Sequence, residues 1–284
     1  MNAVQDALDA LCGETGVRRL TVEPGRDRRG NPEPVAPISF SAGDVVCIVG
    51  ATGSGKSRLL EDIEWLAQGD TPTGRRVLVN GAAPDLSGRY SGTGRLVAQL
   101  SQNMNFVMDA SVGEFLDLHA GSRGLTLDAA RRGAIIDAAN RLTGEALAAD
   151  HQLTELSGGQ SRALMIADTA MLSTSPIVLI DEIENAGIDR HQAIRLLQGE
   201  DKIVLVATHD PSLALLAPRR LVLAGGAIVD VRRRTPQEEL LATRLATLDR
   251  LQERLRNDIR TGLSLDAYLS DPAVPTVPTA KENA

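Results

Sequence analysis

Short apolar runs alternate with longer amphipathic segments along most of this chain. Residues 44–49, 177–180 and 203–208 are almost wholly apolar, whereas residues 57–66 and 161–172 carry apolar positions at helical spacing. A strand of a parallel sheet has a continuous apolar sequence because helices cover both faces of the sheet. Strands that alternate with helices predict an α/β fold with a mostly parallel core sheet.

The rest of the central region adds more strands and one helical block. Strands are predicted at residues 17–23, 38–41, 76–81 and 95–100, the first as an edge strand, and as a closing pair around Gly225-Gly226 at residues 220–231. Residues 24–37 are rich in Arg, Gly and Pro and predict an exposed loop. Residues 111–150 are rich in Ala and Leu with few β-branched residues, which predicts a helical subdomain inserted among the strands.

The two ends of the chain differ from this central region. Residues 1–12 predict a short amphipathic helix, and residues 235–262 predict a charged amphipathic helix in one piece or two. The apolar stripe of the second helix consists of Leu241, Leu245, Leu248, Leu251, Leu255 and Ile259. This stripe either packs back on the domain or pairs with another chain, and it is shorter than the roughly three to four heptads of a coiled coil. Residues 271–284 hold three prolines without periodicity, which predicts disorder.

Composition and charge narrow the class of protein. The net charge of -7 gives no general attraction to nucleic acid, so no nucleic-acid partner is expected. No stretch approaches the roughly 20 apolar residues of a membrane span, and the first residues lack the basic region of a secretion signal. Cys12 and Cys47 form no zinc or disulfide pattern. We therefore expect a cytoplasmic protein.

A glycine-rich stretch lies where the run 44–49 gives way to the amphipathic segment 57–66. It reads Gly50-Ala51-Thr52-Gly53-Ser54-Gly55-Lys56-Ser57 and fits the pattern G-x-x-x-x-G-K-[ST] of a phosphate-binding loop, or Walker A motif. Glycines allow the backbone to wrap a phosphate, and the helix N-terminus attracts the anion. Lys56 is expected to reach the β- and γ-phosphates, and the Ser57 hydroxyl is expected to ligate Mg²⁺.

Four further motifs follow this loop in the chain. Gln102 precedes Ser111 by nine residues, and Leu156-Ser157-Gly158-Gly159-Gln160 precedes the helix predicted at 161–172. Asp181-Glu182 ends the apolar run 177–180, and His209 follows the run 203–208. Together with the phosphate loop, these motifs resemble, in order and spacing, those of ATP-binding cassette (ABC) ATPases over residues 17–232. The resemblance implies an ABC-type P-loop NTPase fold with an antiparallel β subdomain beside the core sheet and an inserted helical subdomain at about residues 103–160.

The resemblance also implies a role for each motif in binding and hydrolysing ATP with Mg²⁺. Asp181, in the Walker B position, would hold Mg²⁺ with Ser57 and Gln102, and Glu182 would be the general base. His209 would contact the γ-phosphate and hold the attacking water, and Gln102 would report the nucleotide state to the helical subdomain. Gln99 is an alternative to Gln102 for this glutamine.

The signature Leu156-Ser157-Gly158-Gly159-Gln160 implies a second subunit. In the family, this segment faces the γ-phosphate that another subunit binds, so Ser157, Gly158, Gly159 and Gln160 are expected to contact ATP in a head-to-tail dimer. Asp189 resembles the aspartate that closes the D-loop, which crosses the same dimer. We therefore expect a homodimer, or a pseudo-dimer with another ABC subunit.

Several residues depart from the pattern of transporter cassettes. Arg58 stands where the family has Thr, beside the nucleotide, and the D-loop is one residue longer than usual. No Tyr or Phe lies in residues 15–35 to stack on adenine. Arg18, Arg19 or the cluster Arg26 to Arg29 could replace it by cation–π stacking, although a solvated loop is the simpler interpretation.

Two functions remain open at this point. The first is the ATP-hydrolysing subunit of a membrane transporter, held at the inner face of the membrane by a separate permease. The alternative is a soluble ABC ATPase that remodels a partner protein or enzyme. In both cases we expect an N-terminal helix in residues 1–16, an ATPase domain in 17–232, a helical extension in 233–270 and a disordered tail in 271–284.

Overall fold

The computed structural model describes residues 16–84, 96–101, 105–182, 187–199, 201–266 and 268. The chain divides into two compact units, Met1–Arg233 and Arg234–Ala284. The helix predicted at 1–12, Gln102 and the tail 271–284 lie outside the described residues. Among the described residues, no helix has the length and apolarity needed to cross a bilayer.

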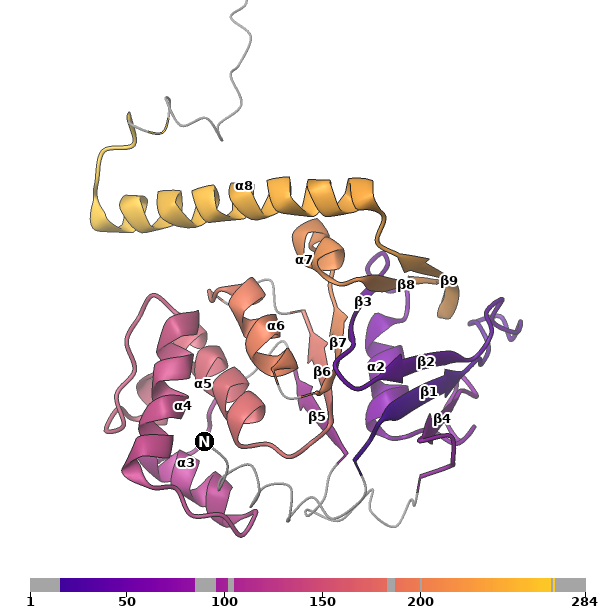
Figure 1. Cartoon of the computed structure of the whole chain (residues 1–284), viewed down its shortest axis with the longest axis horizontal. Coiled ribbons are helices and arrows are strands. Elements are labelled where there is room, and N and C mark those ends of the chain that lie inside the picture. The colour runs from indigo at the N-terminus through magenta and orange to yellow at the C-terminus, as the bar shows by residue number, and fades with distance from the viewer. Residues whose placement is uncertain are drawn as a thin grey trace, which may run out of the picture. The chain divides into compact units, whose positions relative to one another are not determined.

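A six-stranded sheet forms the centre of the first unit (Figure 1). Its strands, in spatial order, are β5 (Val97–Leu100), β6 (Ile177–Asp181), β7 (Ile203–Ala207), β3 (Val45–Val49), β8 (Arg219–Ala224) and β9 (Ala227–Arg233). All neighbours are parallel except the hairpin β8–β9. The predicted α/β class with a mostly parallel sheet is confirmed.

Alternate residues of these strands face opposite sides of the sheet and pack into two separate hydrophobic clusters. On β3, Val45 and Cys47 face one hydrophobic cluster, while Val46 and Ile48 face the other. The first cluster holds the helices of the inserted block, and the second holds helix α2 (Lys56–Glu64) and a three-stranded antiparallel sheet. Both faces of the central strands are therefore covered, which explains their uninterrupted apolar sequences.

The antiparallel sheet has the order β2-β1-β4, with β1 at Arg19–Glu23, β2 at Ile38–Ser41 and β4 at Arg76–Val79. Strand β1 pairs with β2 on one side and with β4 on the other. The prediction that residues 17–23 form an edge strand is therefore wrong. Alternation shows which face of a strand is buried, but it does not show how many neighbours the strand has.

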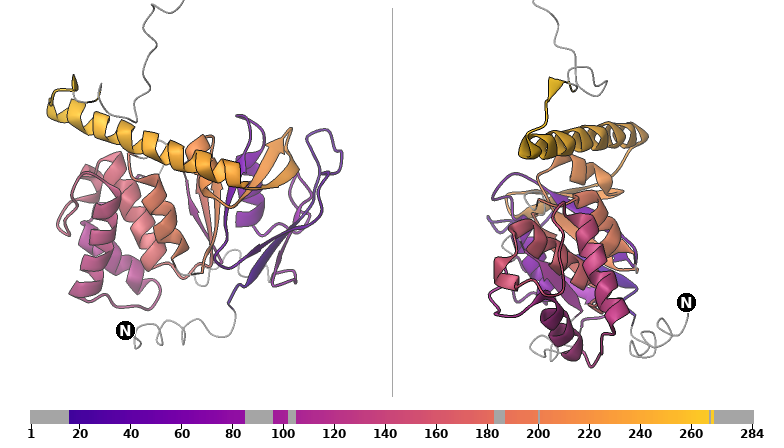
Figure 2. Two further views of the ribbon diagram at one scale, coloured as in Figure 1. Left: turned by 45° about the horizontal axis from the view of Figure 1, so that its top comes forward. Right: turned by 90° about the vertical axis from the view of Figure 1, so that its left-hand side faces the viewer.

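The inserted block contains α3 (Val112–Gly121), α4 (Ala129–Leu142), the short 3₁₀ helix η2 (Leu153–Glu155) and α5 (Gly158–Met171). Ser111 and Glu114 cap α3 reciprocally, Asp128 caps α4, and Ser157 and Gln160 cap α5 reciprocally. In Figure 2 these magenta-to-pink helices lie on one side of the unit and the indigo strands on the other.

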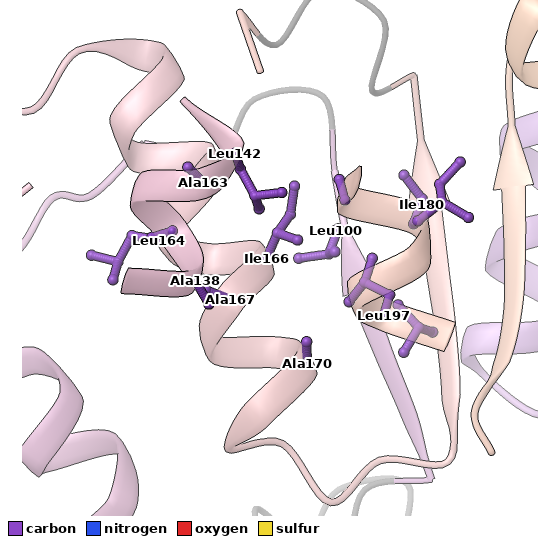
Figure 3. Close-up of a cluster of buried hydrophobic side chains, with 14 of the residues drawn as sticks. Leu100, Ala138, Leu142, Ala163, Leu164, Ile166, Ala167, Ala170, Ile180 and Leu197 are labelled. Carbon is purple, nitrogen blue, oxygen red and sulfur yellow. The ribbon is translucent and has the colours of Figure 1, made fainter. Parts of the chain in front are cut away.

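Helix α5 packs closely because its inner face carries small residues. Ala163, Ala167 and Ala170 are buried, and Figure 3 shows them in one cluster with Leu142 of α4 and Ile180 of β6. Small side chains let neighbouring elements approach closely and fill the space with few voids. The start of α5 is thereby fixed relative to α4 and to the sheet.

Two shorter helices complete the first unit. They are α6 (Arg190–Gln198), capped by Asp189, and α7 (Pro211–Leu216), capped by Asp210. The sequence pattern did not predict either of them. Helix α7, with six residues, is shorter than the window over which helical periodicity can be recognised, whereas α6 has nine residues like α2 but no phosphate loop that marks its start.

The loop 24–37 contributes Glu33 to a buried ionic cluster. The cluster consists of Glu33, Asp62 and Arg75, and we call it the Arg75 cluster. Arg75 donates to Glu33 at 2.6 and 3.2 Å, to Asp62 at 2.8 Å and to the Gly226 carbonyl at 2.9 Å. All three side chains of the cluster are 0% exposed in these pairs. The prediction of an exposed loop is thus wrong at Glu33, which lies inside because its charge is paired there.

Burial of Arg75 lowers the pKa of its guanidinium, and the hydrogen bonds and charges of Glu33 and Asp62 more than offset this, so the pKa lies above its usual value. Glu33 also accepts from the Gly25 and Ile228 amides at 2.8 and 2.6 Å. The Arg75 cluster therefore joins α2, the antiparallel subdomain and the β8–β9 hairpin.

The second unit is dominated by one continuous helix, α8 (Pro236–Thr261). Thr235 and Glu238 form a capping box at its start, and Gly262 ends it with a φ of 71°. Exposed apolar side chains, including Leu240, Leu241 and Ile259, lie along it.

Candidate functional site

The phosphate-loop sequence joins β3 to α2, the position that its mechanism requires. Gly55 is the N-cap of α2 with a φ of 110°, a value that favours glycine. Lys56 is the first residue of the helix, and its ammonium donates to the Gly50 carbonyl at 2.9 Å although its side chain is only 7% exposed. The Lys56 side chain therefore crosses the loop and brings its ammonium to the carbonyl of Gly50, the first residue of the loop.

The glycines of the loop are also needed for packing against the β8–β9 hairpin. A Cβ on Gly50 would lie 2.5 Å from the Leu223 carbonyl oxygen, and one on Gly55 would lie 3.0 Å from the Gly226 Cα. The Gly226 amide donates to the Ser54 carbonyl at 2.8 Å. The hairpin turn thus supports the loop from outside, which the sequence motif did not show.

Ser57 and Asp181 meet at the carboxyl edge of the sheet. Strand β7 lies between β3 and β6 in a parallel sheet, so the ends of these three strands lie together. The Ser57 hydroxyl donates to Asp181 Oδ2 at 3.1 Å. Residues 124 positions apart are therefore in direct contact at this edge of the sheet.

Glu182 and His209 lie next to this pair. Glu182 has a left-handed backbone with a φ of 52°, and its amide donates to the Ala207 carbonyl at 3.0 Å. A non-glycine residue in this region costs about 1–3 kcal/mol and persists only where its surroundings fix it. Its carboxylate lies 3.9 Å from His209 Nδ1, and the His209 side chain is 58% exposed. A base and a polar partner thus face solvent beside the Ser57–Asp181 pair.

The donors of this site fit a nucleotide with Mg²⁺ better than a free metal. Among the described residues, no group of three or more His, Cys, Asp or Glu could hold a metal ion. The Ser57–Asp181 pair offers one hydroxyl and one carboxylate, which suits a cation that takes its other ligands from phosphates and water. The Ser54 hydroxyl is buried in the loop without a hydrogen-bond partner in the described part of the chain. An anion in the loop would give it one.

The signature segment starts α5. Gln160 donates its backbone amide to Ser157 Oγ at 3.2 Å, and its side chain accepts from the Ser157 amide at 3.0 Å. The Ser157 hydroxyl in turn donates to the Glu145 carboxylate at 2.8 Å. No motif contains Glu145, whose carboxylate accepts from the Ser157 hydroxyl, a group that the resemblance assigns to ATP bound by a second subunit.

Asp189 and its neighbour connect three parts of the first unit. The Asp189 amide donates to the carbonyl of Leu142, the last residue of α4, at 2.8 Å, and its carboxylate caps α6. Arg190 pairs with Asp210, the residue after His209. The sequence gives no sign of this ion pair, because its partners are 20 positions apart and neither belongs to a motif.

Arg58, Arg28 and Gln99, which the sequence analysis considered for the nucleotide site, each have a contact within the first unit. Arg58 pairs with Glu61 on the surface of α2 at 2.6 Å. Arg28 leaves the loop 24–37 and donates to the Gly53 carbonyl of the phosphate loop at 2.5 Å. The Gln99 amide faces the carboxylate of Glu64. Glu64 is the last residue of α2, so it lies at the end of that helix opposite the phosphate loop. Gln102 and the D-loop residues 183–186 lie outside the described residues.

A parallel sheet with a glycine-rich loop at one strand end and an acidic pair at another defines a P-loop NTPase. Residues 36–185 match the family model described as ABC transporter. An uncharacterized ABC transporter ATP-binding protein of Methanocaldococcus jannaschii is 50% identical over 246 residues, which are 87% of this chain and 94% of that protein. This chain belongs to the ABC transporter family, among its ATP-binding proteins.

Two solved structures share the fold. CbiO1 of Clostridium perfringens, part of the ABC transporter complex cbiONQ, aligns with a TM-score of 0.56 and 21% identity over 86% of this chain and 95% of that chain. An ATP-binding cassette solved as a dimer in a post-hydrolysis state with ADP and Pi aligns with a TM-score of 0.54 and 21% identity over 76% and 99%. At this identity the likeness supports the ABC ATPase fold.

Proposed function

We propose that this chain is the ATP-hydrolysing subunit of an ABC transporter and works as a head-to-tail dimer with a separate permease. The observation that carries this proposal is the meeting of Ser57 with Asp181, and of Glu182 with His209, at the end of strands β3, β6 and β7. The family of the M. jannaschii relative supports the transporter role. Within this proposal, residues 17–232 form the ATPase domain, with its helical subdomain at about 103–160, and residues 233–270 form a helical extension.

The described side chains divide the work of hydrolysis among them. The loop amides and Lys56 would hold the β- and γ-phosphates, while Ser57 and Asp181, with Gln102, would hold Mg²⁺. Mg²⁺, when bound, neutralises charge on the phosphate oxygens. Glu182 would accept the proton of a water whose oxygen attacks the γ-phosphorus as the bond to ADP breaks. His209, 3.9 Å from the Glu182 carboxylate, would hold that water and the γ-phosphate in line.

The signature of one subunit would complete the site of the other. Ser157 caps α5, so its hydroxyl and the amides of Gly158 and Gly159 lie at a helix N-terminus that attracts anions. Figure 1 shows α5 and α2 on opposite sides of the sheet, so the two half-sites of one chain are separate. The dimeric cassette with ADP and Pi supports an arrangement in which two chains share two nucleotides. We place this dimer at the cytoplasmic face of a membrane, bound to its permease.

Replacing Glu182 by Gln tests the hydrolysis. Gln keeps the shape of Glu182 but cannot take up the proton, so kcat for Mg²⁺-dependent ATP hydrolysis should fall at least about 100-fold. ATP-trapped dimers should then appear in size-exclusion chromatography. Glu239→Gln is a matched control, since the Glu239 side chain is 66% exposed on α8, and should keep the wild-type rate. A wild-type rate in Glu182→Gln, or full activity from a monomer, would contradict the proposal.

Capture of the partner tests the transporter role. The ATP-trapped Glu182→Gln protein would be purified from detergent-solubilised membranes of its own host. Recovery of an integral membrane protein is the expected result. Recovery of a soluble enzyme without a membrane protein would support the alternative, an ABC ATPase that remodels its partner.

A further inference from the structure

The residue that follows His209 is held by an ion pair that the motifs do not contain. Asp210 pairs with Arg190, and the two side chains are only 16% and 19% exposed. Asp210 also caps α7, accepting from the Ser212 and Leu213 amides at 2.7 and 3.3 Å. One carboxylate thus fixes the start of α7 and the start of α6 to each other.

His209 itself lies between two anchored neighbours. On one side, the amide of buried Thr208 donates to the Ile48 carbonyl at 3.1 Å, two residues before the phosphate loop. On the other side, the Asp210 amide donates to the Thr208 hydroxyl at 3.0 Å, and its carboxylate meets Arg190. The backbone at His209 is therefore held on one side by the sheet and on the other by Asp210, which pairs with Arg190.

Arg190 extends this connection into the helical subdomain. It is the first residue of α6, directly after Asp189, whose amide donates to the Leu142 carbonyl at the end of α4. A second contact between α6 and α7 joins Ser212 Oγ to His191 Nε2 at 3.3 Å. A continuous series of polar contacts thus runs from the helical subdomain through Asp189, Arg190 and Asp210 to His209.

We propose that Arg190 is a positioning residue that ties the placement of His209 to the helical subdomain through Asp210. This inference rests on the proposed function, because it assigns Arg190 a part in the same hydrolysis. The Arg190–Asp210 pair sets the distance between His209 and Glu182, which is 3.9 Å here. A displacement of about 1 Å in a positioned group can slow an enzyme by about 100-fold, so the pair controls kcat. ATP affinity depends on the phosphate loop, whereas the contacts described for the pair are with each other, Thr208 and the first turn of α7.

Arg190→Gln is the decisive variant. It keeps much of the aliphatic stem but removes the charge, so kcat should fall by about 10- to 100-fold while KM for ATP changes by less than about twofold. Arg190→Lys keeps a charge on a stem of similar length and should recover kcat to within about fivefold of wild type. Arg195→Ala removes an exposed arginine from the last turn of the same helix and should keep the wild-type kcat.

A separate measurement distinguishes positioning from general loss of structure. In the Glu182→Gln background, Arg190→Gln should leave the ATP-dependent dimer unchanged, because ATP binding does not use the pair. Wild-type kcat in Arg190→Gln would overturn the inference, as would a parallel loss of kcat, ATP affinity and dimer. If Arg190→Gln does not fold, Arg190→Lys becomes the test of the inference. A kcat of Arg190→Lys no higher than about 1% of the wild-type value, with a normal KM for ATP, would contradict the prediction that a positive charge at this position restores kcat. Absence of hydrolysis in the wild-type protein would instead contradict the proposed function.

Discussion

Replacing Arg75 by Met should strongly destabilise the first unit. Met fills a similar volume without charge, so Glu33 and Asp62 would stay in place with no cation between them. Four hydrogen bonds from the guanidinium would be lost, two to Glu33, one to Asp62 and one to the Gly226 carbonyl. Breaking a buried ion pair from one side costs about 3–5 kcal/mol, because a charge is left uncompensated. The Gly25 and Ile228 amides still donate to Glu33, which keeps the expected cost within this range.

Urea unfolding followed by tryptophan fluorescence measures this loss directly. The chain has a single tryptophan, Trp65, which follows the last residue of α2, three positions from Asp62. With a slope of about 3 kcal/mol/M, a loss of 3–5 kcal/mol lowers the urea midpoint by about 1–2 M. That loss is a large part of the roughly 5–15 kcal/mol by which domains are stable.

The adjacent residue offers a matched control. Arg76 is 53% exposed and lies 3.8 Å from Glu23, so Arg76→Met should change the stability by less than about 0.5 kcal/mol. If Arg75→Met costs less than about 1 kcal/mol, or no more than Arg76→Met, the Arg75 cluster does not stabilise the fold and the reasoning is refuted.

Two further predictions concern the nucleotide site. Arg28→Ala removes the guanidinium that donates to Gly53, so the phosphate loop loses a support and KM for ATP should rise several-fold with little change in kcat. Arg29→Ala, at the exposed neighbouring position, is its control, and an equal KM in both variants would contradict this role. Glu145→Gln removes the negative charge of the carboxylate that accepts from the Ser157 hydroxyl, so a γ-phosphate should meet less repulsion there. In the Glu182→Gln background, ATP-dependent dimers should therefore form at several-fold lower ATP concentration. Sedimentation velocity measures the dimer fraction, exposed Glu155→Gln is the control, and unchanged or weaker dimers would show that Glu145 does not oppose association.

The sequence predicted those parts of the fold that depend on local patterns. The core strands are recognisable because both of their faces are buried, and the long helices because their apolar positions repeat over several turns. The pairing of Ser57 with Asp181 was also predictable, since motifs at the ends of parallel strands meet at one edge. These predictions needed only the order of elements and the chemistry of a few residues.

Contacts between distant, ordinary residues could not be predicted in this way. Glu33 lies in a segment with the composition of an exposed loop, and only its pairing with Arg75, 42 positions away, explains its burial. Arg190 and Asp210 are common surface residue types, and neither belongs to a motif. Whether β1 is an edge or a central strand depends on β4, which follows after the whole phosphate loop and α2. Tertiary pairing decides all three cases, and a single sequence carries no local signal of it.

The position of β3 in the sheet determines when the phosphate loop can form during synthesis. Both neighbours of β3 come from the last third of the chain, with Val45 paired to Val204 and Val46 to Arg219. The hairpin turn that supports the loop, at Gly225-Gly226, is made later still. Contacts between such distant residues form slowly, and an unpaired apolar strand is prone to aggregate until its partners arrive. The nascent chain therefore carries the loop sequence through most of translation before it can hold a nucleotide, and chaperone demand should fall only after β8 and β9 emerge.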